Sequence, residues 1–433
     1  MKTGRKDGVK NALKSYYKLV KTSHSQHPNK TVLSSMSTNY DIIIIGAGLV
    51  GMSTALACAY KGAKIAIIDA VHPDEKRQDG RASAIAASSF QMFKTLDVIQ
   101  SLEAEFQPVQ DMLISDGSVN DVSPLMLHFD SREVNGPTGY MVENDVLRRA
   151  LFSAVKAQTG IEFFAPVELV ETQLDPAFVQ VSLSNGVEIT GSLIVAADGR
   201  RSTQRKSAGI GVFRHRYNQK ALVTTFCHEF PHDGVAHQIF FSGGPLALLP
   251  LTENRMSIVW TDRASAIEAA MNLPEKAFIA ELRRRSGNFL GEMFLCADRQ
   301  MFPLSLQMAE TYTSNRLALV GDAAHAIHPL AGQGLNMGLR DAAALADVIV
   351  KSKSLGLDIG TDLKDYNVWR NFDTQVLAAS TDILNRVFSN RVSPIRHMRR
   401  LGLAAINQTS VAKSFFMKEA SGKSGNLPSL LRG

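Results

Sequence analysis

Residues 42–51 read Ile-Ile-Ile-Ile-Gly-Ala-Gly-Leu-Val-Gly, and this stretch decides the fold. Four β-branched residues in a row predict a strand that is buried on both faces, as in a parallel sheet covered by helices. Gly46 permits a tight turn after the strand, Gly48 lets the backbone approach a pyrophosphate, and Gly51 allows the next helix to lie close to the strand. The N-terminal amides of that helix then point at the phosphates.

The following residues complete a βαβ unit. Small residues over 49–60 predict a helix, and the apolar run 65–68 predicts the next strand. Asp69 ends that strand eighteen residues beyond Gly51, where a carboxylate can accept hydrogen bonds from a ribose. Together these features predict a dinucleotide site, but they do not separate FAD from NAD.

Two later apolar runs, 193–197 and 317–320, extend the same parallel sheet, and material of another kind separates them. Alternating segments there predict half-buried antiparallel strands, and they are 221–228, 237–242 and 255–261. After residue 340 the pattern turns helical. The sequence therefore predicts an α/β protein: a Rossmann-like dinucleotide-binding domain with an inserted antiparallel β domain and C-terminal helices.

Composition limits the class of protein. The chain has 433 residues, 45% of them hydrophobic, enough for a large core and two packed domains. The net charge of +6 is local, because residues 1–38 alone carry +7. The rest of the chain is therefore almost neutral and gives no reason to expect nucleic-acid binding. No apolar run of ~20 residues predicts a membrane-spanning helix.

The basic tail, residues 1–38, lacks the apolar core of a secretory signal. Two interpretations stay open: an organellar presequence, or an overlong start, because Met36 stands directly before the first strand.

The three cysteines, Cys58, Cys227 and Cys296, are far apart and form no Cys-x-x-Cys pair. We therefore expect neither a disulfide framework nor a zinc site, and we expect the protein to lie in a reducing compartment.

Two further motifs identify the cofactor. Residues 196–202 read Ala-Ala-Asp-Gly-Arg-Arg-Ser, residues 321–325 read Gly-Asp-Ala-Ala-His, and residues 328–341 read His-Pro-Leu-Ala-Gly-Gln-Gly-Leu-Asn-Met-Gly-Leu-Arg-Asp. With these motifs the sequence closely resembles the class A flavoprotein aromatic hydroxylases, which have the para-hydroxybenzoate hydroxylase fold. Within them it resembles the ubiquinone-biosynthesis hydroxylases. The resemblance covers roughly residues 39–425.

The resemblance implies a role for each matching residue. Asp198 and Gly199 belong to a motif shared between the FAD pyrophosphate and a transient nicotinamide site, and Asp322 bonds the ribityl chain. The residues that it assigns to FAD, together with those of the glycine turn, are Gly46, Gly48, Gly51, Asp69, Arg81, Asp198, Gly199, Gly321, Asp322, Pro329, Gly332, Gln333, Gly334 and Asn336. A helix that begins near Leu335 presents a positive end to the flavin and stabilises its anionic reduced form. The alternative is that the glycines only turn the chain, Asp322 caps a helix and Arg81 is solvated.

The resemblance also implies a domain division. The FAD-binding domain comprises 39–115, 140–205 and 306–350, the substrate domain 116–139 and 206–305, and the C-terminal helical region 351–433. Residues 237–251 resemble the strands that form the pocket wall, which makes Gln238, Phe240, Leu249 and Pro250 candidate substrate residues; an ordinary amphipathic hairpin is the alternative. His325 and His328 have HxxH spacing without a third ligand, so capping or core packing is favoured over a metal site.

The C-terminal region carries a different pattern. Residues 391–418 combine basic side chains with Leu, Ile and Phe, which indicates a membrane-surface helix. A packed helical layer with a solvated basic face is the alternative.

The implied function is FAD-dependent hydroxylation of an aromatic ring through a flavin C4a-hydroperoxide. The substrate class is a polyprenylated phenol of ubiquinone biosynthesis, with O2 as co-substrate, NAD(P)H as transient donor, and a biosynthetic protein complex as a further partner. No nucleophile–His–acid set is evident, so no catalytic side chain is assigned. The expected location is the cytoplasmic side of the inner membrane, or the matrix side of the mitochondrial one. The alternatives are another aromatic substrate, another FAD oxidoreductase, or a non-catalytic flavoprotein. The ring position, the donor and the oligomeric state stay open.

Overall fold

A computed structural model describes most of the chain from Asn39 onward. The described residues are 39–75, 79–100, 102–118, 121–134, 136–327, 333–389, 417–418 and 421–432. The basic tail, His328, Pro329, Gly332 and most of the predicted membrane-surface segment lie outside them. Within the described ranges, no helix is long and apolar enough to cross a membrane.

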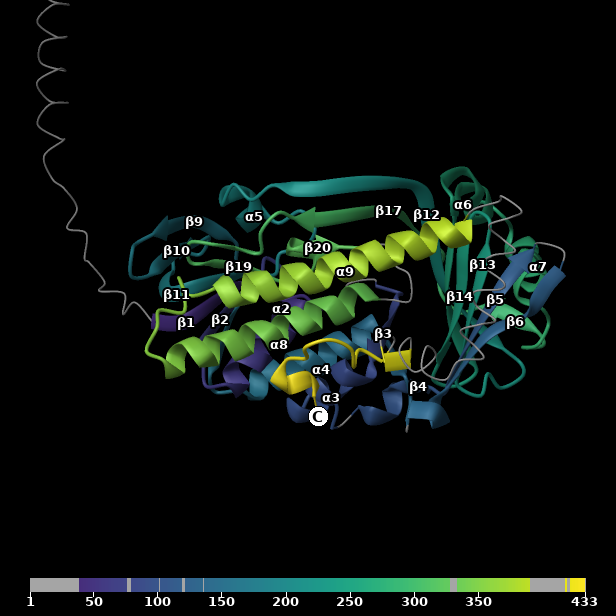
Figure 1. Cartoon of the computed structure of the whole chain (residues 1–433), viewed down its shortest axis with the longest axis horizontal. Helices are drawn as coiled ribbons and strands as arrows, with labels where there is room; N and C mark the ends of the chain where they lie inside the picture. Colours follow the sequence, from purple (N-terminus) through teal and green to yellow (C-terminus); the bar gives the residue numbers. More distant parts are fainter. Residues whose placement is uncertain are drawn as a thin grey trace, which may run out of the picture. The chain divides into compact units, whose positions relative to one another are not determined.

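A mixed sheet forms the first layer (Figure 1). Its order is β18 (Thr313–Ser314), β19 (Leu317–Leu319), β11 (Glu188–Ala196), β1 (Asn39–Ile45), β2 (Ile65–Ile68) and β8 (Ile161–Phe164), with β10 (Val179–Leu183) and β9 (Leu169–Leu174) added antiparallel on β11. From β19 to β8 the strands run parallel, and Ile42 lies opposite both Ile65 and Leu193. The four predicted apolar runs are therefore strands of one sheet, as expected.

Small residues let a helix lie close to this sheet. Helix α2 (Leu49–Tyr60) packs against α8 (Gln333–Ser354) and α4 (Asn144–Ala157), and most of its side chains are buried. A Cβ on Gly51 would stand 1.9 Å from the carbonyl oxygen of Gly46, so only glycine fits there. Gly46 itself has φ +105°, which favours glycine. The βαβ prediction is confirmed.

A second, nine-stranded sheet follows, with two small helices on its outer face. Its order is β20 (His325–Ala326), β17 (Gln300–Ala309), β12 (Val212–His228), β15 (Arg255–Arg263), β14 (Gly244–Leu251), β13 (Val235–Phe241), β5 (Asp111–Ser118) and β6 (Asp121–Asp130), with β16 (Met293–Leu295) beside β12. The predicted strands 221–228, 237–242 and 255–261 lie in β12, β13 and β15, whose pairings with β14 and with one another are antiparallel.

The prediction of half-burial is wrong for residues 221–226 of β12. Residues 221–226 are all buried, because β12 is covered on both faces. Leu222 and Phe226 pack toward α6 (Ala264–Met271) and α7 (Glu275–Ser286), while Ala221 and Val223 face a cavity on the opposite side. Alternation of polarity is lost where both faces of a strand are covered.

A three-stranded sheet and the C-terminal helices complete the fold. The sheet has the order β3 (Ala82–Ala86), β7 (Gly139–Glu143) and β4 (Gln107–Val109). Helix α3 (Ala87–Thr95) follows β3, and α9 (Lys364–Ser389) lies beside α8 (Figure 1). The short elements are η1 (Glu103–Glu105), η2 (Ser131–Val134), α5 (Thr203–Ser207), η3 (Gly321–Ala323) and η5 (Ser429–Leu431). The helical pattern predicted after residue 340 is confirmed by α8 and α9, and the α/β fold class is confirmed as well.

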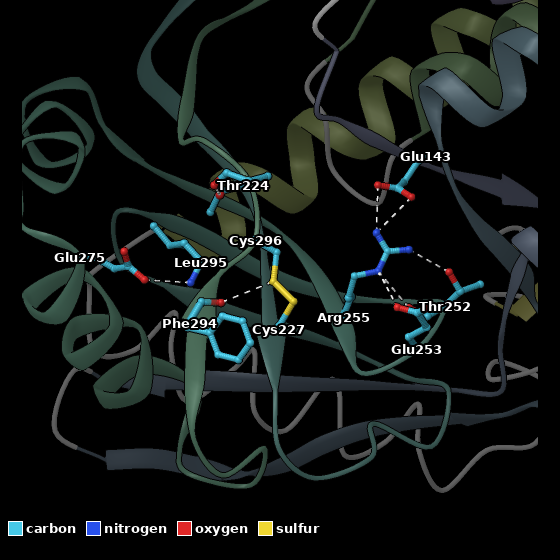
Figure 2. The surroundings of a disulfide bond; sticks show 11 residues. Glu143, Thr224, Cys227, Thr252, Glu253, Arg255, Glu275, Phe294, Leu295 and Cys296 are labelled. Atoms are coloured by element: carbon cyan, nitrogen blue, oxygen red, sulfur yellow. Dashed lines mark hydrogen bonds and ion pairs between the residues drawn. A yellow bond between two sulfur atoms is a disulfide. The ribbon is translucent and has the colours of Figure 1, made fainter.

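Two of the three cysteines form a disulfide, so the expectation of none is wrong for this pair. Cys227 lies in β12, Cys296 directly follows β16, and their sulfur atoms are bonded (Figure 2). The two residues are 69 positions apart, but β12 and β16 pair antiparallel and set Cys227 opposite Phe294. Sequence spacing cannot show this, because the contact depends on the register of strands that are not neighbours in the chain. Cys58 is free and buried.

Candidate functional site

The glycine turn after β1 forms an open cradle. A Cβ on Gly46 would lie 2.5 Å from the carbonyl oxygen of Ala197, which places this turn directly against the end of β11. A Cβ on Gly48 would meet no described atom within 4 Å. Gly48 is also the N-cap of α2 and supplies no side chain to its first-turn amides. These amides are therefore available to a phosphate, as the predicted cofactor role requires.

Asp69 braces this turn from the end of β2. One of its carboxylate oxygens accepts a hydrogen bond from the Ala47 amide at 2.6 Å, and the other accepts one from the Val71 amide at 2.9 Å. The predicted ribose acceptor thus lies beside the glycine turn.

The Asp198-Gly199 motif follows β11 and is tied to the other motifs. Asp198 Oδ2 accepts hydrogen bonds from the amides of Thr203 at 2.7 Å and Gln204 at 3.3 Å. Its Oδ1 is buried and has no hydrogen-bond partner among the residues that the structure describes. An orphaned acceptor at this position fits a hydroxyl or other donor group of a bound cofactor. Gly199 has φ +79°, as a sharp turn requires.

A buried arginine that the sequence analysis missed joins two of the motifs. Arg205 is 1% exposed and donates hydrogen bonds to the carbonyl oxygens of Ala323 at 2.6 Å and Arg200 at 3.1 Å. It therefore fixes the end of η3 against the turn that follows β11. Its position in a short, basic, polar stretch gave no sign of burial.

The Gly321-Asp322 turn lies over the start of α2. A Cβ on Gly321 would come within 3.1 Å of the Val50 side chain, and a Cβ on Gly338 within 2.6 Å of it. The side chain of Asp322 is half exposed, and its Oδ2 lies 3.9 Å from Nε of Arg200. The first and third sequence motifs thus meet, and Asp322 faces outward from their junction toward a cavity.

The buried side chain of Asp341 fixes the Gly321-Asp322 turn, a role that the sequence analysis did not assign. Its Oδ2 accepts hydrogen bonds from the Gly321 amide at 2.9 Å and lies 2.6 Å from Nε2 of His325. Its Oδ1 accepts one from Nε of Arg370 at 2.7 Å, and all three side chains are at most 1% exposed. Burial alone would raise the pKa of Asp341, but His325 and Arg370 outweigh it and hold that pKa below its usual value. His325 is thus a buried core residue in an ion network.

Arg81 stands at the mouth of the cavity. It pairs with Asp79, with Nε 2.7 Å from Oδ1, and its guanidinium lies 5.4 Å from the centre of the Phe302 ring. Burial raises the pKa of Asp79, but hydrogen bonds from Arg81 and Asn144 outweigh it, so that pKa is lowered. About half of the Arg81 side chain stays exposed, so an anion can reach it.

A cavity of about 430 Å³ lies between Asp322 and the nine-stranded sheet. Its lining is Arg81, Ala82, Ala84, Arg200, Ala221, Val223, Ala247, Leu249, Val259, Phe302, Pro303, Leu304, Ser305, Asp322 and Ile327. Ala84 and Leu249 also line a second cavity of about 90 Å³, here called the Gln238 cavity, whose other members include Tyr140, Gln333 and Asn336.

The predicted substrate residues are divided between two faces of their hairpin. Gln238 and Leu249 line the Gln238 cavity, and Phe240 shares the face of Gln238 because strand side chains alternate. The same alternation puts Pro250 on the opposite face from Leu249. Leu249 alone reaches both cavities.

The start of α8 is fixed to β3 by one side chain. Asn336 donates a hydrogen bond to the carbonyl oxygen of Ala84 and accepts one from the amide of Ala86, both at 2.8 Å. Gln333 begins α8 and lines the Gln238 cavity, and a Cβ on Gly334 would meet no described atom within 4 Å. The start of α8 therefore borders this cavity, and the effect of its positive end on the flavin stays a prediction.

Comparison with known proteins identifies this arrangement. The family model described as FAD binding domain matches residues 39–353. The chain belongs to this family. A second model, squalene epoxidase, matches residues 297–417. The resemblance to flavoprotein hydroxylases and the expectation of FAD as the cofactor are both confirmed.

Relatives cover nearly the whole chain. Ubiquinone hydroxylase UbiL of Rhodospirillum rubrum is 42% identical over 91% of this chain and 92% of its own. The 3-demethoxyubiquinol 3-hydroxylase of Escherichia coli is 35% identical over 88% and 98%. The crystal structure of p-nitrophenol 4-monooxygenase PnpA from Pseudomonas putida shares the fold, with a TM-score of 0.75 at 16% identity, and covers 90% of this chain and 100% of its own.

Proposed function

We propose that this chain is an FAD-dependent monooxygenase that hydroxylates the aromatic ring of a polyprenylated phenol in ubiquinone biosynthesis. The observation that carries the proposal is the mainly apolar cavity between Asp322 and β14, which borders the flavin motifs. The names of relatives that match along nearly their full length give the substrate class.

The described residues fit FAD. The amides at the start of α2 would hold the pyrophosphate, Asp69 a ribose and Asp322 the ribityl chain, while the orphaned Oδ1 of Asp198 accepts a further donor. Bound FAD supplies the activation of O2 and the transfer of one oxygen atom to the ring. The start of α8, at Gln333, would stabilise negative charge on the flavin ring.

The chain itself orients the substrate and excludes water. The apolar side chains of β12 and β14 form a dry wall, which strengthens electrostatic contacts inside the cavity. Gln238 lines the adjoining Gln238 cavity, where its amide would hydrogen-bond the phenol oxygen. Asn336 is already paired with the β3 backbone, so its role is to position α8.

Electron supply and location belong to the same proposal. Arg81 and Arg200 line the mouth of the larger cavity and suit the phosphates of NAD(P)H as transient donor. A polyprenylated phenol is insoluble in water, so the enzyme meets it at a bilayer surface, on the cytoplasmic face of the inner membrane or the matrix face of the mitochondrial one. A biosynthetic complex would work there with it. In this scheme FAD is bound by residues 39–115, 140–205 and 306–350, the substrate is enclosed by residues 116–139 and 206–305, and residues 351–433 form the C-terminal region.

Complementation tests the proposal. The chain is expressed in strains that each lack one ubiquinone ring hydroxylase, and quinone intermediates are measured by mass spectrometry. Restoration of ubiquinone in one strain, with loss of its accumulated precursor, is expected. Failure in every strain, with FAD-loaded protein present in each, would contradict the proposed substrate class.

A further inference from the structure

A third cavity lies next to the Gln238 cavity and is lined by residues of α3, α8, α9 and the C-terminal segment. It holds about 250 Å³ and is here called the α9 cavity. Its lining is Ala86, Ser88, Ser89, Gln333, Asn336, Met337, Arg340, Arg370, Phe372, Asp373, Val376, Leu377, Gly422, Ser424, Gly425 and Leu431. Ala86, Gln333 and Asn336 line both cavities, so the two cavities adjoin at these residues.

The charged groups of the α9 cavity are engaged with one another. Nη1 of Arg370 donates to Asp373 at 2.6 Å, and Nη1 of Arg340 lies 3.5 Å from the same carboxylate. The second carboxylate partner of Arg370 is Asp341, below the cavity floor. Because these charges compensate one another, the cavity does not call for an ionic ligand. Its exposed lining is mainly apolar.

An apolar stripe on α9 leads to this cavity. Val368, Phe372 and Val376 follow one another at four-residue spacing, which places them on one face of the helix. They are 60%, 68% and 51% exposed, although large apolar side chains gain by burial. Phe372 and Val376 also line the cavity, so the stripe is continuous with its entrance. Exposed apolar surface of this kind marks a contact with an apolar partner.

A basic groove of about 460 Å³ borders the same cavity. It shares Ser88 and Leu431 with the α9 cavity and carries Lys94, Lys423 and Arg432 along its length. Lys94 is paired with Glu103 at 2.9 Å. The other two cationic side chains, Lys423 and Arg432, lie beside an apolar entrance and match the surface of a bilayer that contains anionic lipids, from which an isoprenoid chain would be drawn.

We propose that the α9 cavity binds the polyisoprenyl chain of the substrate. The ring then occupies the Gln238 cavity, and the chain leaves it past Gln333 and Asn336 and crosses the α9 cavity to the surface at Phe372 and Val376. This assignment rests on the proposed function. It explains why an aromatic hydroxylase exposes Phe372 beside the α9 cavity. The occupant is apolar along the stripe, while the basic groove faces the lipid head groups.

The test separates the chain from the ring. FAD-loaded wild type, Phe372→Asp, Phe372→Ala and a control, Leu355→Asp, are assayed with a polyprenylated phenol and with the same phenol that carries a methyl group in place of the tail. Leu355 is 62% exposed and does not line the cavity. We expect Phe372→Asp to raise KM roughly tenfold for the prenylated phenol and less than about twofold for the tail-less one, because only the chain meets this side chain. Phe372→Ala should give a smaller shift in the same direction.

A binding measurement covers the case in which no turnover is seen. Geranylgeraniol is titrated into the same FAD-loaded proteins, and we expect Phe372→Asp to weaken its binding roughly tenfold while Leu355→Asp leaves it unchanged. Equal KM shifts for both phenols, or geranylgeraniol binding that is indifferent to Phe372, would overturn the proposal. Turnover of neither phenol by wild type, with the binding difference intact, would count against the proposed function alone and support the chain site.

Discussion

Replacement of Asp341 by alanine removes the carboxylate that joins the Gly321 amide, His325 and Arg370. Breaking a buried ion pair by deleting one partner costs about 3–5 kcal/mol, because the other charge stays buried. Arg370 keeps Asp373 as a second partner at 2.6 Å, so the lower end of that range applies to it. The Gly321 amide loses its acceptor as well, which adds about 1–3 kcal/mol.

We therefore expect Asp341→Ala to lower the free energy of unfolding by about 4–6 kcal/mol, a large part of the ~5–15 kcal/mol that a folded domain has. Asp341→Asn keeps the shape and can still accept from Gly321, so its loss should be about half as large. The free energy is measured by urea unfolding of FAD-loaded and FAD-stripped protein. Asp365→Ala on α9 is a suitable control, since its partner Lys351 is 61% exposed and such a pair is worth at most ~1 kcal/mol.

Asp322→Ala distinguishes the contribution of the Gly321-Asp322 turn to FAD binding from its contribution to the stability of the folded chain. Asp322 is half exposed and faces the cavity, so its loss should weaken FAD by ~1.5–3 kcal/mol, roughly tenfold to a hundredfold, without destabilising the stripped protein. Asp341→Ala should weaken FAD and also destabilise the stripped protein, because Gly321 is no longer fixed. The reasoning is refuted if stripped Asp341→Ala unfolds within about 1 kcal/mol of wild type.

Three further predictions use single sites. Gly48→Val should fold, because a Cβ meets nothing within 4 Å, yet purify without flavin colour; normal FAD content would show that the turn only bends the chain. In native protein at pH 8, iodoacetamide should leave Cys58 unlabelled, because burial raises its pKa to about 12, and should label Cys227 and Cys296 only after reduction, as mass spectrometry can check. Burial lowers the pKa of His237 from 6.5 to about 4, so the unfolded chain takes up a proton at this site before the folded protein does. The free energy of unfolding should therefore be unaffected by this residue above pH 6.5 and should fall by about 3 kcal/mol as the pH is lowered to 4. His237→Gln should remove this fall from the plot of unfolding free energy against pH, and an unchanged plot would contradict the assignment.

Local signals predicted the fold well. The strand at 42–45, the glycine turn and the helix that follows depend on residues next to one another in the chain, and backbone sterics at Gly46 and Gly51 leave one solution. The end of each buried strand could also be predicted, because it too depends on residues that are neighbours in the chain. The disulfide and the burial of β12 depend instead on which strands become neighbours, and no local pattern carries that information.

The site was predicted as three separate motifs, and its connections were missed. The sequence analysis gave Asp341 no role, since it lies inside a helix and away from any strand end. Its importance comes from Arg370, which stands 29 residues later on α9 and reaches it only when the two helices pack side by side. Arg205 was missed likewise, because its acceptor at Ala323 lies 118 residues away.

The start of α8 is the point where these connections meet. Asn336 fastens it to β3 on one side, and Asp341, five residues later, fastens it to η3 through the Gly321 amide. Two anchors on one helix, directed to two different elements, fix both its position and its rotation. The first residues of α8 near Gln333 and the carboxylate of Asp322 are thereby held at a set separation. Preorganisation of this kind lets a positive helix end act on a flavin without reorganisation during the reaction. It also explains why both anchoring side chains are paired, with Asp341 buried and Asn336 partly buried, while Asp322, which would meet the cofactor, is half exposed.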